Sequence, residues 1–183
     1  QPFQLMSKLI SPDESLSQPS ATALESWNYL LIWGGMPALL SVEFSVEDRH
    51  EWLEDYVVTY LQRDLADLAQ LEQLEPFVRA LKASALRVAK PINFSELARL
   101  ADVSPPTARK FMRYLELSYQ AFLLQPWFRN MEKRLCKQPK LHFLDPGVRR
   151  AILRKRGACD GAEFEDAVVA EVYKQIHSLR LPI

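Results

Sequence analysis

The longest apolar pattern in the chain runs from residue 46 to residue 72. Ser45 and Asp48 have the spacing of a capping box, in which each side chain accepts the other residue's backbone N–H at a helix start. The apolar residues that then recur at three- and four-residue steps are Leu53, Tyr56, Val57, Tyr60, Leu61, Leu65 and Leu68. This step is the period of one helix face. The pattern predicts one long helix with an acidic opposite face.

Residues 92–117 predict a helix, a turn and a second helix. Asn93 is an N-cap residue for the first helix, with Glu96 as its reciprocal partner. Ser104 caps the second helix, and Pro105 occupies the first helical position, where proline is favoured. The residues expected to face inward are Leu97, Leu100, Val103, Phe111, Met112, Leu115 and Leu117.

Two strands with a basic connection follow this pair of helices. The apolar run 121–127 predicts one strand, and residues 141–145 predict a second strand that ends in the turn "DPG". Residues 129–140 join them and are rich in lysine and arginine. Helix, turn, helix and two-stranded arm together predict a winged helix-turn-helix.

Four further helices complete the pattern, and one of them is the short basic segment 148–157. Residues 22–33 are apolar on every side, which predicts a short buried helix that stops at two glycines. Pro76 starts another helix, whose expected inward residues are Phe77, Leu81, Ala85 and Leu86. Asp160 and Glu163 form a second capping box. The last helix then has Phe164, Val168, Val172 and Ile176 in line.

Composition narrows the class of protein. The chain is 48% hydrophobic, but no apolar run reaches the length of about 18 residues that a membrane span needs. The first residues, "QPFQLMSKLI", have no long apolar segment of a secretory signal, and we expect them to lie inside a longer protein. Two distant cysteines and three scattered histidines predict neither a disulfide framework nor a metal site. A cytoplasmic location without membrane attachment is therefore expected.

Charge is uneven although the net charge is zero. Residues 1–90 carry 7 basic and 13 acidic side chains, whereas residues 91–160 carry 14 and 6. The basic part contains the helix-turn-helix, whose second helix would meet base edges near its start. The side chains expected to contact DNA are Thr107, Arg109, Lys110 and Arg113 of this helix and Lys133, Arg134 and Lys137 of the wing. Alternatively, these basic groups are simply solvated or pair with the acidic front half.

Three other charged residues are candidates for function. Arg63, beside Asp64 on the long helix, is a candidate nucleotide sensor, and the structural alternative is a salt bridge that fixes helix packing. Asp145 and Glu165 are candidate acids of a nuclease-like site. A turn role for Asp145 and a favourable helix-dipole position for Glu165 are the structural alternatives. The sequence contains no phosphate-binding loop, dinucleotide motif or recognisable nucleophile–base set, so no catalytic residue is assigned.

The order of four segments resembles the C-terminal half of a family of prokaryotic ATPases of the AAA+ superfamily. The segments are "WGGMPALL", "YVVTYLQRDL", the stretch from "YLELSYQ" to "GVRRAIL", and "GAEFEDAVVAEV". The residues that match are Gly34, Gly35, Pro37, Arg63, Asp64, Asn130, Lys133, Arg134, Leu135, Pro139, Lys140, Phe143, Asp145, Gly147, Gly161, Phe164, Glu165 and Val168. Pro146 departs from the pattern, which has a small polar residue between the aspartate and the glycine.

The resemblance implies a P-loop ATPase module before this part, a winged helix within it, and a nuclease-like module of the PD-(D/E)XK type that begins at its end. Glu165 matches an acid of the first helix of that module. ATP and magnesium are then implied for the parent protein, and no cofactor or metal is expected in this part. The implied partners are double-stranded DNA, the ATPase and nuclease-like parts of the same chain, and a further copy of the chain.

The predicted fold class is mainly α: a helical lid and connector, a winged helix-turn-helix, and the start of a small α/β nuclease-like element. The expected segments are 1–21 (loose), 22–75 (lid remnant and connector), 76–143 (winged helix) and 144–183 (start of the nuclease-like domain). The predicted function is a non-catalytic part of an ATPase whose winged helix couples the motor to DNA. The alternatives are a DNA-independent packing module of the same ATPase and, third, a transcriptional regulator.

Overall fold

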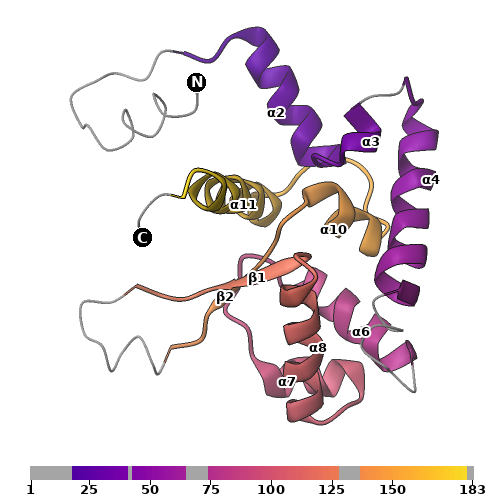
Figure 1. Cartoon of the computed structure of the whole chain (residues 1–183), viewed down its shortest axis with the longest axis vertical. Coiled ribbons are helices and arrows are strands. Elements are labelled where there is room, and N and C mark those ends of the chain that lie inside the picture. The colour runs from indigo at the N-terminus through magenta and orange to yellow at the C-terminus, as the bar shows by residue number, and fades with distance from the viewer. Residues whose placement is uncertain (1–17, 41–42, 65–73, 128–136, 181–183) are drawn as a thin grey trace.

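The computed structural model describes residues 18–40, 43–64, 74–127 and 137–180, with the backbone alone described for 61–64. The fold is mainly α, as predicted, with one small sheet in these residues (Figure 1). The elements are α2 (Ala21–Trp33), α3 (Pro37–Leu40), α4 (Val46–Tyr56), the π-helix η1 (Val57–Asp64), α6 (Leu74–Ala85), α7 (Phe94–Ala101), α8 (Pro105–Leu117), β1 (Ala121–Leu124), β2 (Lys140–Phe143), α10 (Pro146–Ile152) and α11 (Gly161–Ser178). None of these helices is long and apolar enough to cross a lipid bilayer.

Side-chain caps explain where the helices begin. The Ser45–Asp48 and Asp160–Glu163 capping boxes are both present, as predicted. Asn93 accepts N–H groups at the start of α7, and Ser104 does so at the start of α8 with Pro105 following it. Satisfying the first N–H groups of a helix in this way fixes its start from local sequence alone.

The helix predicted over 46–72 starts at the expected residue but changes its hydrogen-bonding pattern partway. The regular α-helix α4 gives way to the π-helix η1 at Val57. Val57, Val58 and Thr59 are consecutive β-branched residues, whose restricted side-chain torsions disfavour regular α-helix. Residues 65–72 of the prediction lie outside the described residues.

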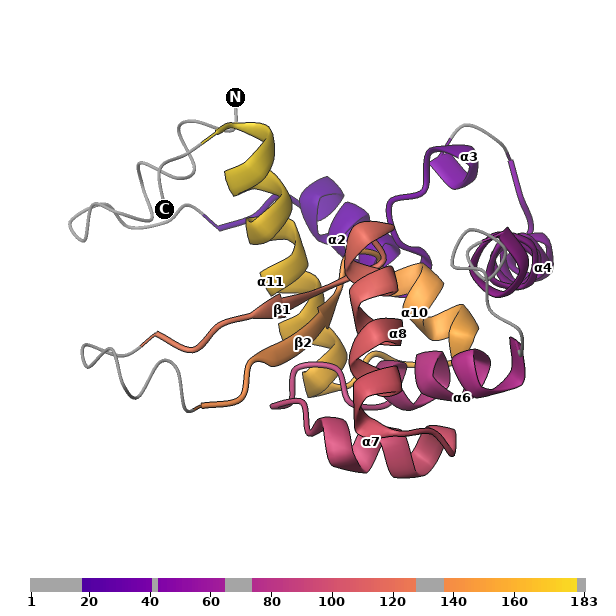
Figure 2. The ribbon, with the colours of Figure 1, turned by 60° about the horizontal axis from the view of Figure 1, so that its bottom comes forward.

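The helices α6, α7 and α8 precede an antiparallel pair of strands, in the order predicted from the sequence. β1 pairs with β2 in a register that places Phe122 opposite His142. The segment 89–92 adds hydrogen bonds to the other side of β2, with a bridge between Pro91 and Lys140. Figure 2 shows the two strands running outward from the helices, with α11 alongside β2. Both strands are shorter than the apolar runs that predicted them.

One apolar core joins the elements. Its fully buried side chains include Leu53 of α4, Phe77 and Leu81 of α6, Leu97 of α7 and Phe143 of β2. The short helix α10 lies centrally and packs against α2, α4 and α6 (Figure 1). The core therefore runs across the segments predicted for the connector, the winged helix and the part after residue 144.

Several predicted orientations are wrong. The helix over 22–33 forms, but only Leu31 of α2 is buried, because α2 packs through its C-terminal half. Leu86 and Leu117 are mostly exposed, since one follows the last turn of α6 and the other ends α8. Leu100 is also exposed. The predicted turn "DPG" instead opens α10, with Asp145 as its N-cap.

The last helix presents its apolar stripe to solvent. Phe164 is 50% exposed, and Val168 and Val172 are exposed as well. The buried residues of α11 are Glu163, Asp166, Ala167 and Ala170. The alignment of the apolar residues was predicted correctly, but the buried face of α11 instead carries two carboxylates and two alanines.

Candidate functional site

The helix α8, which was predicted as the second helix of a helix-turn-helix, separates its apolar and basic residues. Ala108, Phe111, Met112 and Leu115 are buried. Arg109, Lys110 and Arg113 are exposed, so they are not buried against the acidic long helix. At the start of α8, the hydroxyl groups of Ser104 and Thr107 lie 2.8 Å apart and complete the cap.

Arg109 and Lys137 face the same hollow. This hollow, which we call the α7–α8 groove, has a volume of about 270 Å³ and is lined by Ile92, Asn93, Phe94, Ser95, Arg109, Lys137, Gln138 and Pro139. None of these described lining residues carries a carboxylate. The Arg109 guanidinium lies 4.3 Å from the centre of the Phe94 ring, which orients it at the groove. A cationic hollow beside an exposed basic helix can receive a phosphate group.

The other basic residues of α8 have weaker local partners. Arg113 lies 3.9 Å from Glu116 one turn along the exposed surface. The Lys110 ammonium is 5.7 Å from the centre of the Tyr114 ring. Exposed contacts of this kind contribute little free energy, so both cations can exchange them for a phosphate.

Three predicted site residues cannot be placed. Lys133 and Arg134 of the predicted wing lie outside the described residues. The backbone of Arg63 belongs to η1, but its side chain lies outside the described part. The predicted wing is therefore represented here by Lys137 and the two strands.

Asp145 connects its own segment to "WGGMPALL", another of the segments that carry the family resemblance. Its carboxylate accepts the N–H of Gly35 at 2.8 Å and the N–H of Val148 at 2.9 Å. A Cβ on Gly34 would lie 2.0 Å from Asp145 Oδ1, and one on Gly147 would lie 2.0 Å from the Trp33 carbonyl oxygen. Burial raises the pKa of Asp145, and these hydrogen bonds oppose the rise. The contacts give the glycines and Asp145 a structural role.

Glu165 has a different partner from Asp145. Its carboxylate accepts from the Lys140 ammonium at 2.6 Å, at the half-exposed surface of α11. The two predicted nuclease acids therefore have no hydrogen-bond partner in common among the described residues. No cluster of three or more metal-binding side chains occurs among the described residues.

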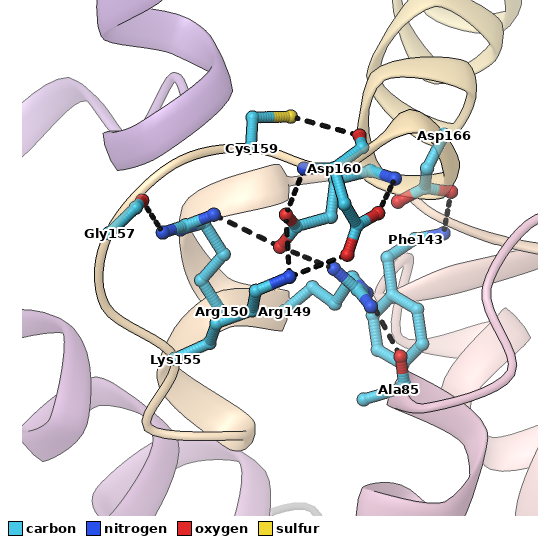
Figure 3. A network of polar contacts seen from close by, with 10 residues as sticks. Ala85, Phe143, Arg149, Arg150, Lys155, Gly157, Cys159, Asp160 and Asp166 are labelled. Carbon is cyan, nitrogen blue, oxygen red and sulfur yellow. Dashed lines mark hydrogen bonds and ion pairs between the residues drawn. The ribbon is translucent and has the colours of Figure 1, made fainter.

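A buried ionic network between α10 and α11 was not predicted from the sequence (Figure 3). Glu163, only 3% exposed, accepts from Arg149 at 2.8 Å, Arg150 at 3.0 Å and Lys155 at 2.9 Å. Burial opposes ionisation of Glu163, but the hydrogen bonds and cations win and lower its pKa. The Lys155 ammonium, with the N–H of Glu163, also lowers the pKa of Asp160 to about 2.

A second buried polar pair lies beside this network. His142 Nδ1 and the Phe143 N–H both lie 3.0 Å from Asp166 Oδ1. Burial raises the pKa of Asp166, against the lowering effect of these hydrogen bonds. The Asp160–Glu163 capping box was visible in the sequence, whereas the second role of Glu163 and the burial of His142 and Asp166 had no local signal.

The geometry defines a mainly α module with an exposed basic face and a buried ionic junction. The profile of a family described as "Domain of unknown function (DUF8612)" matches residues 24–158, so the chain belongs to this family. The matched residues run from α2 to the loop that precedes α11.

Two curated mycobacterial proteins are similar to the chain. They are the uncharacterized proteins Mb2031c of Mycobacterium bovis and Rv2008c of Mycobacterium tuberculosis, each 33% identical over 124 residues. The alignment covers 68% of this chain and 28% of each relative. The chain therefore spans little more than a quarter of the length of these relatives. No solved structure matches the chain significantly.

Proposed function

We propose that α6–α8 and the β1–β2 hairpin act as a winged helix that contacts double-stranded DNA. In this proposal α8 enters the major groove, and the exposed cations around it neutralise phosphates. The module has no catalytic role of its own. It couples DNA to an ATPase of the AAA+ superfamily, in the cytoplasm, with ATP and magnesium bound elsewhere in the parent protein.

The observation that carries the proposal is the shared position of Arg109 and Lys137. These residues come from α8 and from the segment that leads into β2, yet both line the α7–α8 groove. Lys110 and Arg113 are exposed on the same helix as Arg109. Four cations drawn from a helix and a hairpin give the pattern of phosphate contacts that fixes a protein on a duplex.

The experiment is a titration of a labelled blunt duplex with the protein at 50 and 200 mM salt. Four phosphate contacts predict a fall in affinity of about 100-fold between these salt concentrations. The double variant Arg109→Glu/Arg113→Glu should bind at least about tenfold more weakly at 50 mM salt, with a shallower salt dependence.

The matched control is Lys174→Glu/Arg180→Glu, which makes the same change of net charge on and after α11. If both double variants weaken binding equally, the attraction comes from overall charge and the α8 interface is wrong. If the unmodified protein does not bind duplex DNA at 50 mM salt, the DNA-binding proposal fails.

A second candidate function is DNA-independent packing or protein interaction within the same ATPase. The exposed apolar stripe of α11 favours it, since Phe164, Val168 and Val172 lie in line on one helix face. Contiguous exposed apolar residues mark surfaces that meet another protein surface. This candidate predicts that substitutions in the α11 stripe, and not substitutions in α8, weaken the interaction with the rest of the ATPase.

A further inference from the structure

A hollow that the proposed DNA contact does not use lies among α2, α3 and α4. We call it the Arg49 pocket. It has a volume of about 470 Å³, and its lining includes Tyr29, Leu30, Leu39, Leu40 and Arg49. Figure 1 shows the short helix α3 between α2 and α4, where these residues come together. The volume lies within the range of about 300–1,000 Å³ that is usual for small-ligand sites.

Two hydrogen bonds hold the wall of the Arg49 pocket in place. The Tyr29 hydroxyl donates to the Leu39 carbonyl at 2.9 Å and so joins α2 to α3. Gly35, which also lines the pocket, donates its N–H to the Asp145 carboxylate at 2.8 Å. The segment "WGGMPALL" therefore supplies part of a wall that is fixed by contacts within the protein.

Aromatic rings orient the Arg49 side chain. Its guanidinium carbon lies 5.5 Å from the centre of the Tyr29 ring and 5.7 Å from the centre of the Trp33 ring. The two rings are four residues apart on α2, so they lie on one face of that helix. Cation–π contacts at these distances are attractive. The guanidinium is therefore held in position before any ligand binds.

Arg49 differs from other shielded arginines in having no counter-ion. Arg149 donates to Glu163 at 2.8 Å, and Arg87 pairs with Glu96. Among the described residues, the Arg49 guanidinium makes no hydrogen bond or ion pair, and its Nε is buried without an acceptor. A shielded cation without a partner is costly, so an anion bound in the pocket gains a strong interaction there.

The charges of the lining favour a carboxylate over a phosphate. Arg49 is the one cationic side chain among the described residues that line the pocket, and Glu25 places an exposed carboxylate at the same lining. A phosphate dianion would meet one cation and the repulsion of Glu25. A carboxylate carries a single charge, and its two oxygens match the planar fork of a guanidinium.

The remaining lining favours an apolar body on the ligand. Leu30, Leu39 and Leu40 contribute aliphatic surface, and Tyr29 contributes the side of its ring. Leu40 is 64% exposed, which leaves apolar surface open to water at the pocket. Ligand sites typically combine such apolar walls with a few polar groups that fix the orientation of the ligand.

We propose that the Arg49 pocket binds a carboxylate carried on an apolar body. The guanidinium donates to the carboxylate oxygens, and the apolar body lies against the leucines of α2 and α3. A free small acid and the C-terminus of a peptide both present this chemistry. The site goes beyond the proposed DNA contact and does not depend on it.

The test is an NMR titration of the protein with 4-phenylbutyrate, with its neutral amide and with phenyl phosphate. The signals followed are the Arg49 Nε–H and the Gly35 N–H. We expect the acid to bind about 10- to 100-fold more tightly than the amide, the range that charge-assisted hydrogen bonds supply. Phenyl phosphate should bind more weakly than the acid. A pentapeptide ending in two leucines, compared with its C-terminal amide, tests the peptide source.

Arg49→Gln should reduce the affinity for the acid to that of the amide. Arg49→Lys keeps the charge but loses the fork, so its affinity should lie between the two. The matched control is Arg99→Gln, which makes the same change at an exposed arginine of α7 and should leave binding unchanged.

Substitutions of Leu40 test the pocket without removing the stacked guanidinium. Because Leu40 is mostly exposed, the fold should tolerate a polar side chain there. Leu40→Glu adds a like charge beside the ligand and should weaken binding of the acid more than the neutral Leu40→Gln does.

The outcomes decide for or against the pocket. Equal binding of the acid and the amide overturns the proposal, and so does tighter binding of phenyl phosphate. Unchanged affinity in Arg49→Gln, or equal affinity of the two Leu40 variants, also overturns it. Binding of the peptide without binding of the small acid supports the pocket and assigns a peptide C-terminus as the source, and the reverse assigns a free acid. The proposal fails if neither signal moves at about 10 mM of acid or peptide, which exceeds the Kd expected for ligands of this size.

Discussion

The helices α8 and α11 both carry a stripe of apolar residues along one face. The stripe of α8 is buried, whereas most of the α11 stripe is exposed. α8 buries Phe111 and Leu115 and exposes its arginines, as an amphipathic helix usually does. α11 exposes Phe164 and Val168 and buries two carboxylates. The apolar stripe therefore decides which face of a helix is buried only when the neighbouring elements offer an apolar surface.

Part of the surface offered to α11 is charged, although the Tyr173 ring of α11 also stacks on Phe122 of β1. α10 presents two buried guanidinium groups, and Arg149 is further fixed by its Nε–H donating to the Ala85 carbonyl at 2.9 Å. A buried cation without a counter-ion costs several kcal/mol, so an acidic helix face gains more there than an apolar one. Ala167 and Ala170 are small enough to let α11 approach closely.

The largest expected effect comes from removing the acid at the centre of this junction. Glu163→Ala leaves Arg149 and Arg150 buried without their shared carboxylate. We expect the free energy of unfolding to fall by about 3–5 kcal/mol, measured by urea denaturation. Glu163→Gln keeps the shape and a carbonyl acceptor and should cost less. A loss below about 1 kcal/mol for the alanine variant would mean that the network does not anchor α11.

The next effect compares the truncation of a buried and of an exposed aliphatic side chain in the two helices. Leu115→Ala in α8 removes a buried side chain and should destabilise the protein by about 2–5 kcal/mol. Val172→Ala in α11 removes an exposed one and should change stability by about 0.5 kcal/mol or less. Thermal unfolding of both variants checks the contrast. Equal losses would show that the α11 stripe is covered in solution, which would favour the protein-interaction candidate.

The smallest effect is a pH dependence at the start of α11. The folded-state pKa of Asp160, about 2, lies below its ordinary value of 3.8, so its contribution is present above pH 4 and is lost as the pH falls through about 2. Because the Asp160 side chain is half exposed, solvent screening limits this contribution to about 1 kcal/mol. Asp160→Asn should flatten the fall in stability between pH 4 and 2. If the stability of Asp160→Asn falls as much between pH 4 and 2 as that of the unmodified protein, the fall comes from other carboxylates.

The parts of the fold that the sequence predicted are those fixed within a few residues. Asn93, Ser104 and the Asp160–Glu163 box mark helix starts because a cap is a local hydrogen bond. The exposed cations of α8 followed from the four-residue step between Arg109 and Arg113. Such features depend on neighbours along the chain, so the sequence is sufficient to find them.

The missed features depend on residues that meet only after folding. The burial of Glu163 requires the guanidinium groups of α10, and the shared hollow of Arg109 and Lys137 requires the hairpin to fold back beside α7. The predicted burial of Leu86 and Leu117 was wrong because the periodic pattern continued to, or past, the end of a helix. The spacing of apolar residues does not by itself show where a helix ends or which helix packs against it.

The contact between Asp145 and Gly35 has a kinetic consequence. The two residues are 110 positions apart, and the start of α10 is inserted so closely against the end of α2 that glycine is needed on both sides. Closing so long a loop costs more entropy than forming the contacts among α6, α7 and α8, which lie near one another in the chain. We therefore expect α2 to dock late in folding, after the other helices have packed together. We also expect it to be the first helix released when the protein begins to unfold.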